Sequence, residues 1–203
     1  SEDPQRDRPA WLAFAREVNE WLDACGYPLC KGQVMASNPA CCLTPQEWRE
    51  RFLKWIEQGS PEDLLAASIY FDLRPLAGQL DLAQGLMELV ADKTRANPRF
   101  CRQLAEEVLR SPAALGWLGG IEAQSIDGVA MLDLKLHGTA VFVAVARLRS
   151  LAEGITEVNT RRRLEAIARI RGVPAHHAQA WVSAFEFLQM LRLRTQLQGP
   201  DPA

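Results

Sequence analysis

Most of the chain repeats apolar residues at steps of three and four, the spacing that places them on one face of a helix. The first such segment ends at Gly26. Two later segments open with Thr44–Glu47 and Ser60–Asp63, each a hydroxyl, a proline and an acid in capping order. The hydroxyl can accept from an amide in the first turn, proline suits that turn, and the acid can reach back to the cap. These signals predict a helix after each of them.

Five more helices follow from the same spacing, over residues 76–96, 100–109, 139–151, 160–171 and 175–197. Gln33–Ala36 reads as a short strand, and residues 115–126 are glycine-rich and suit a loop or a small hairpin. Leu132–Leu136 alternates apolar and charged residues, a period of two that places both charges on one side. We therefore expect an all-α or nearly all-α multi-helix bundle with at most a few short strands.

Two acid-x-base units lie in apolar surroundings. Asp133 and Lys135 precede the most hydrophobic predicted helix, and Asp72 and Arg74 sit among apolar residues farther upstream. Unpaired buried charge is costly, so these groups need partners. One interpretation is a structural charge network joining the two segments, which the residues alone favour. The other is a substrate-binding cleft whose Arg and Lys face phosphate or an acidic protein surface.

Other polar residues give weaker signals. His137 is more typical of a hydrogen-bonded structural imidazole than of a catalytic one, and it joins the candidate network. Arg192 and Arg194 are candidate anion contacts, although a solvated helix face is the simpler interpretation, as it is for Arg161–Arg163. No Ser-His-Asp order, P-loop or dinucleotide fingerprint can be assembled. The sequence therefore predicts no catalytic residue.

Composition narrows the setting of the protein. A formal net charge of -2 gives no reason to expect nucleic acid as a partner. No apolar run is long enough to span a membrane, and the charged start is not a signal peptide. The five cysteines show no zinc-like spacing, which favours reduced thiols over a metal site and predicts a cytoplasmic location. Because the first residue is Ser1, we expect a piece of a longer protein.

Six stretches of the sequence, taken in order, carry a resemblance to a known family: Cys25–Cys30, Val34–Pro39, Glu47–Phe52, Ser68–Arg74, Leu132–Gly138 and Ala184–Leu188. Together they resemble a family of bacterial signalling nucleotidyltransferases. Members of this family carry cyclic-nucleotide-binding and CBS domains upstream and are similar to the uridylyltransferase that acts on the PII protein. The resemblance implies that residues 1–43 are the tail of the nucleotidyltransferase domain, 44–197 a helical substrate-binding domain and 198–203 a loose tail.

The resemblance also implies where the chemistry lies. The Gly-Ser and Asp-x-Asp motifs of the family would precede residue 1, so Mg²⁺ and a nucleoside triphosphate belong to the parent protein and this chain alone is inactive. The expected partners are the upstream domain and a protein or small-molecule acceptor that this chain positions for transfer, and an oligomer is left open. The alternative is a regulatory helical module that relays ligand signals without chemistry, because Gln33–Ala36 lacks the third acid that such folds often add.

Overall fold

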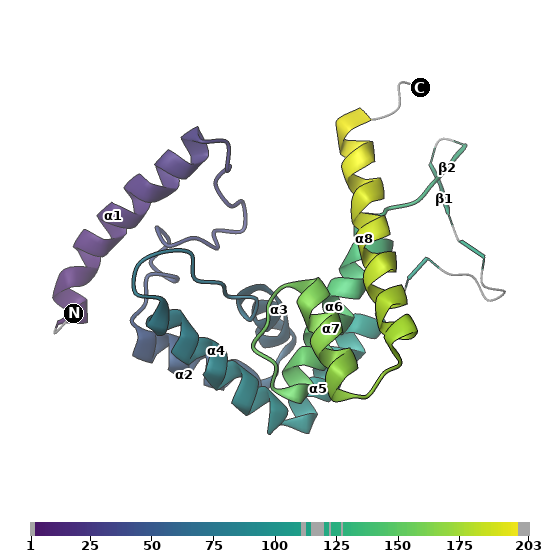
Figure 1. Cartoon of the computed structure of the whole chain (residues 1–203). Helices are drawn as coiled ribbons and strands as arrows, with labels where there is room; N and C mark the ends of the chain where they lie inside the picture. Colours follow the sequence, from purple (N-terminus) through teal and green to yellow (C-terminus); the bar gives the residue numbers. More distant parts are fainter. Residues whose placement is uncertain (1–2, 111–112, 115–119, 122, 127, 199–203) are drawn as a thin grey trace. The chain divides into compact units, whose positions relative to one another are not determined.

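The structure, a computed structural model, describes residues 3–110, 113–114, 120–121, 123–126 and 128–198. It confirms the all-α expectation, because helices dominate these residues and the two strands form one small antiparallel pair (Figure 1). Residues 1–51 and 52–203 form two compact units. The elements are α1 (Pro4–Ala24), α2 (Pro45–Gln58), α3 (Pro61–Tyr70), α4 (Leu80–Arg95), α5 (Pro98–Leu109), β1 (Gln124–Ile126), β2 (Val129–Met131), the π-helix η1 (Lys135–Thr139), α6 (Ala140–Glu153), α7 (Thr160–Ile170) and α8 (Ala175–Gln198).

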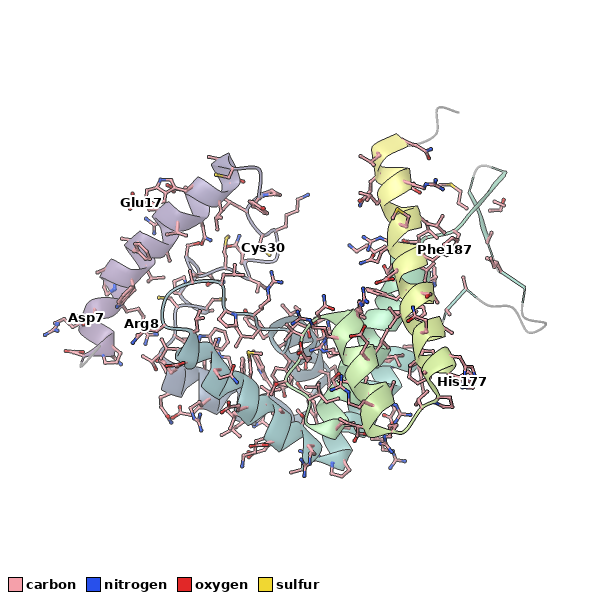
Figure 2. The ribbon with its side chains drawn as sticks, viewed as in Figure 1. Asp7, Arg8, Glu17, Cys30, His177 and Phe187 are labelled. Carbon is pink, nitrogen blue, oxygen red and sulfur yellow. The ribbon has the colours of Figure 1, made fainter. Side chains whose placement is uncertain are left out.

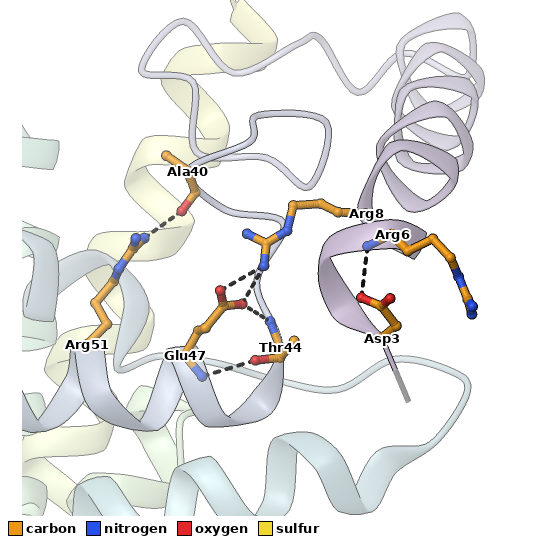
Figure 3. A network of polar contacts seen from close by, with 7 residues as sticks. All are labelled: Asp3, Arg6, Arg8, Ala40, Thr44, Glu47 and Arg51. Carbon is orange, nitrogen blue, oxygen red and sulfur yellow. Dashed lines mark hydrogen bonds and ion pairs between the residues drawn. The ribbon is translucent and has the colours of Figure 1, made fainter. Parts of the chain in front are cut away.

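The first unit is fastened by a charged contact between α1 and the start of α2. The predicted capping box is present, since the Glu47 amide donates to Thr44 Oγ1 and the Thr44 amide donates to Glu47 Oε2 at 2.8 Å. Arg8 Nη2 donates to both carboxylate oxygens of Glu47, at 2.7 and 2.9 Å (Figure 3). These donors, Arg8 foremost and then the Thr44 amide, lower the pKa of Glu47 to about 2.

The strand expected at Gln33–Ala36 is wrong. Gln33 has a φ of +58°, which is incompatible with extended backbone, and turns flank it. The side-chain amide of Asn38 donates to the Gln33 carbonyl at 2.8 Å. Arg51 Nη1 also donates to the Ala40 carbonyl, 2.5 Å away (Figure 3). Side chains thus satisfy two carbonyls of this loop, where a strand would have bonded its carbonyls to a neighbouring strand.

Aromatic side chains build the core where α2, α3 and α5 meet. Phe52 lies against Phe71 with ring centroids 5.2 Å apart, and Phe71 lies 6.1 Å from the fully buried Phe100. The side-chain amide of Asn97, which caps α5, donates to the Ile56 carbonyl at 3.0 Å. The Asn97-Pro98 signal therefore both ends α4 and attaches α5 to the end of α2.

Helix α6 is central to the second unit and packs against α4, α5 and α7. The buried hydroxyl of Thr94 on α4 donates to the Leu151 carbonyl of α6 at 3.0 Å. On another face of α6, Ala146 joins Leu164, Val182 and Phe185 in an apolar cluster that unites α6, α7 and α8. The predicted apolar helix, α6, thus packs against α4, α5, α7 and α8.

Several boundaries differ from the prediction. Helix α4 begins at Leu80 and not at residue 76, because Gly78 adopts a φ of +83° that a right-handed helix does not allow. The strand pair lies at residues 124–126 and 129–131, while residues 115–119 and 122 of the predicted glycine-rich segment lie outside the described residues. Helix α8 extends through Gln198, and residues 199–203 of the predicted tail are likewise not described. In the described part of the chain, no helix combines the length and apolarity that crossing a membrane requires.

Candidate functional site

A helical turn replaces the alternating strand expected at Leu132–Leu136. Asp133 Oδ1 accepts hydrogen bonds from the amides of Lys135 and Leu136, at 2.8 and 2.7 Å. The carboxylate is exposed and acts as a helix cap, and these two amides hold its pKa below the usual range. Sequence alternation misled here because Leu132 and Leu136 are 36% and 48% exposed, so the alternation does not mark a buried strand face, and Asp133 caps a turn instead.

The turn continues as a π-helix before α6 begins. The Thr139 amide donates to the Leu134 carbonyl five residues back, at 3.0 Å. Gly138 lets α8 come close, since a Cβ at this position would lie 3.4 Å from Leu188 Cδ2. Insertions of this kind occur often at functional sites because they redirect side chains within a helix. Here residues of the π-helix line a groove.

The groove encloses about 590 Å³ and is lined by residues of α3, α5, η1, α6 and α8. Leu64 and Leu104 belong to its apolar lining and are themselves buried, so the wall is part of the core. Three basic side chains also line the groove: Lys135, Arg147 and Arg192. An apolar cleft with a few convergent polar groups is the usual form of a small-ligand site.

The basic side chains are held in different ways. Arg192 Nη1 donates to Thr139 Oγ1 and to Gln189 Oε1, both at 3.1 Å. Lys135 is exposed and makes no ion pair within the described part of the chain. The one acid in the lining, Glu107, pairs with Arg110 at 2.7 Å. The groove therefore favours an anionic ligand.

Asp72 holds the third basic residue, Arg147, in place through an ion pair. Its Oδ2 accepts from Arg147 Nε and Nη2, at 3.0 and 2.5 Å, and its Oδ1 forms an ion pair with Arg163 Nη1 at 2.7 Å. Arg163 is only 2% exposed, and its Nε donates to the Glu157 carbonyl at 2.6 Å. Burial alone would raise the pKa of Asp72, but the hydrogen bonds and charge of Arg147, with Arg163, lower it overall.

Burial acts in the opposite sense on the pKa of Arg163. Desolvation lowers that pKa, although the charge of Asp72 works against the shift. The pair is therefore interdependent, because Asp72 supplies the only carboxylate that contacts Arg163 in the described structure. Asp72, after α3, Arg147 on α6 and Arg163 on α7 thus form a charge network joining three helices.

The structure brings some of the predicted residues together and separates others. Lys135 and Arg192 line one groove, and Asp72 holds the Arg147 that lines it too. No ion pair in the described structure joins Asp72 to Arg74, or the Asp72 unit to Asp133. Arg74 is exposed, and Arg194 is exposed on α8 outside the groove lining. His137 lies on η1, and its charge helps to lower the pKa of Asp133.

Sequence reasoning missed Arg147 and misjudged Arg163. The expectation that Arg161–Arg163 is a solvated face is right for Arg161 and Arg162 but wrong for Arg163, which is buried. The helical spacing carried a signal, because Arg163 lies four residues before the buried Ile167 on the same face. Among the described residues, no group of three or more His, Cys, Asp or Glu side chains is placed to hold a metal ion.

The described residues form a helical domain with a groove that basic side chains line. The family described as "Putative nucleotidyltransferase substrate binding domain" matches residues 98–201, just over half of the chain, and the chain belongs to this family. A second family, described as "Putative nucleotidyltransferase", matches residues 1–62. No curated protein and no solved structure matches the chain.

Proposed function

We propose that the groove between α3, α5, η1, α6 and α8 holds the acceptor in a nucleotidyl transfer reaction. The observation that carries this proposal is the convergence of Lys135, Arg147 and Arg192 on one largely apolar cleft, in a chain of a substrate-binding family. The acceptor then has an anionic group for the basic side chains and an apolar portion for the leucine-lined wall. Protein and small-molecule acceptors both remain within this description.

The transfer step itself belongs, in this proposal, to a nucleotidyltransferase segment that precedes the helical domain. The match of residues 1–62 to a nucleotidyltransferase family supports this arrangement. Mg²⁺ and a nucleoside triphosphate would act there, since the described residues of this chain offer no carboxylate cluster for a divalent ion. The chain's own residues bind and orient the acceptor. The two family matches leave residues 63–97 unassigned, so a domain boundary after residue 43 stays a prediction.

A bacterial signalling setting completes the proposal. The six sequence stretches that resemble signalling nucleotidyltransferases support a parent protein with cyclic-nucleotide-binding and CBS domains, related to PII uridylyltransferase and located in the cytoplasm. In that setting the helical domain would present the acceptor in response to ligands bound upstream.

The test uses the intact protein that contains this chain, labelled nucleoside triphosphates, Mg²⁺ and fractionated cell extract as the source of acceptors. We expect label to pass to an acceptor, and Lys135→Gln to lower the initial rate at limiting acceptor. Label on no acceptor from any triphosphate, with the Gly-Ser and Asp-x-Asp motifs intact, would contradict the proposal.

A second candidate function is a regulatory module that binds another protein without chemistry. The observation that favours it is a set of exposed apolar side chains on α8: Phe187 is 63% exposed (Figure 2), and Met190 and Leu197 are also exposed. Exposed apolar patches of this kind mark interaction sites. Phe187→Asp would then abolish partner binding by the intact protein, whereas the acceptor proposal expects transfer to survive this substitution.

A further inference from the structure

A second groove lies on the opposite face of α6 from the acceptor groove. It encloses about 550 Å³ and is lined by residues of α6 and α7 and by Val173 and Trp181. From α6 it takes Phe142, Val145 and Arg149, which the helical period places on the face opposite Ala144 and Arg147 of the acceptor groove. Val141 is the one residue that the two linings share.

The floor of this second groove is rigid. Leu164 and Ile167 are 7% and 6% exposed, and both belong to the packed interior. Phe142 lies against Phe185 with ring centroids 6.0 Å apart, which fixes the aromatic part of the wall. A floor made of core residues keeps its shape when the groove is empty, and such preformed apolar clefts are the usual hosts of small molecules.

The rim combines an aromatic ring with unequal positive charges. Arg171 forms an ion pair with Glu153, so its charge is already matched. Arg149 is exposed and makes no ion pair within the described part of the chain. Trp181 is 37% exposed and lines the same groove. The rim thus offers one unmatched guanidinium and one indole ring.

We propose that this second groove binds a small organic anion with a flat, apolar ring. The ring packs against Trp181 and the apolar floor, and the anionic group pairs with Arg149. Planar guanidinium groups suit carboxylate, sulfonate and phosphate oxygens alike, so the shared chemistry is an oxyanion on a ring of modest size. This site is separate from the proposed acceptor groove and does not depend on nucleotidyl transfer.

The experiment measures binding of two matched probes to the protein by calorimetry: naphthoate, which has the ring and a carboxylate, and naphthylmethanol, which has the ring alone. Naphthoate should bind more tightly than the alcohol, by roughly five- to tenfold for one charge-assisted contact at an exposed site. Arg149→Gln should remove this difference and leave the alcohol unaffected, and Trp181→Ala should weaken both. Arg169→Gln is the control, since Arg169 is exposed on α7 outside the lining.

Three results would overturn the proposal. One is the absence of saturable binding for naphthoate, and another is equal affinity for the two probes in the unchanged protein. The third is a dimer in sedimentation that Val145→Asp converts to monomer and that saturating naphthoate leaves intact, because the groove would then be an interface between two copies. None of these results bears on the acceptor proposal, so failure of the second-groove proposal can be told apart from failure of the acceptor proposal.

Discussion

Arg147 Nη2 lies 2.5 Å from Asp72 Oδ2, and this contact connects the charge network of the second unit to the acceptor groove. Asp72 also neutralises the buried Arg163, so one carboxylate serves two guanidinium groups. The same acid therefore stabilises the packing of α6 on α7 and sets the position of a basic side chain that lines the groove.

Removing the Asp72 charge should destabilise the protein strongly. Asp72→Asn leaves the Arg163 guanidinium, 2% exposed, without its carboxylate, and breaking such a pair costs about 3 kcal/mol when one partner is partly exposed. Urea denaturation followed by circular dichroism measures the free energy of unfolding. Arg74→Ala is the matched control, since Arg74 is exposed and should change stability by less than about 0.5 kcal/mol. Equal losses in both variants would contradict the network.

Truncating a side chain at the centre of the aromatic core should lower the stability of the protein strongly. Phe100 is 0% exposed and contacts Phe71, so Phe100→Ala leaves a cavity and should lower the free energy of unfolding by about 3–5 kcal/mol. Phe187→Ala removes an equal volume from an exposed position on α8 and should cost far less. The same denaturation experiment compares the two, and similar midpoints for both variants would argue against the aromatic core.

The contact between α1 and α2 should weaken in acid. Because the pKa of Glu47 falls from 4.5 to about 2 on folding, its contribution to stability is present above pH 4.5 and is lost as the pH falls from 4.5 toward 2. A carbon-detected NMR titration of the Glu47 carboxyl should give a midpoint near 2 in the folded protein. Arg8→Gln should move that midpoint upward, because Arg8 is the main cause of the shift. A midpoint near 4.5 in the unchanged protein would refute this contact.

The helices were largely predictable, because capping residues and apolar spacing are local signals. Thr44–Glu47 and Ser60–Asp63 both form the capping boxes that their sequences indicate. The prediction of strands failed where a side chain forms hydrogen bonds with backbone groups of residues nearby in the sequence. Asp133 caps a turn in a stretch that alternates like a strand, and Asn38 helps to hold the loop at Gln33.

The candidate site was predictable only in part, because ion pairs between distant segments leave little trace in one sequence. Lys135 and Arg192 were identified as candidates and do line one groove. Their neighbour Arg147 was missed, because α6 carries two arginines, Arg147 and Arg149, and one sequence does not show which of them pairs with a distant acid. Asp72 was expected to join the segment of Asp133, but its partners come from α6 and α7, 75 residues away along the chain in the case of Arg147.

The central claim, that the groove holds the acceptor, is tested most directly by comparing Arg192→Gln with Arg194→Gln in the intact protein. Both arginines are on α8, but only Arg192 lines the groove. Labelled nucleotide transfer is measured against acceptor concentration at saturating nucleoside triphosphate. Arg192→Gln should raise the acceptor concentration for half-maximal transfer roughly tenfold, as loss of one charged hydrogen bond predicts, while Arg194→Gln leaves it unchanged. Equal behaviour of the two variants would contradict the claim.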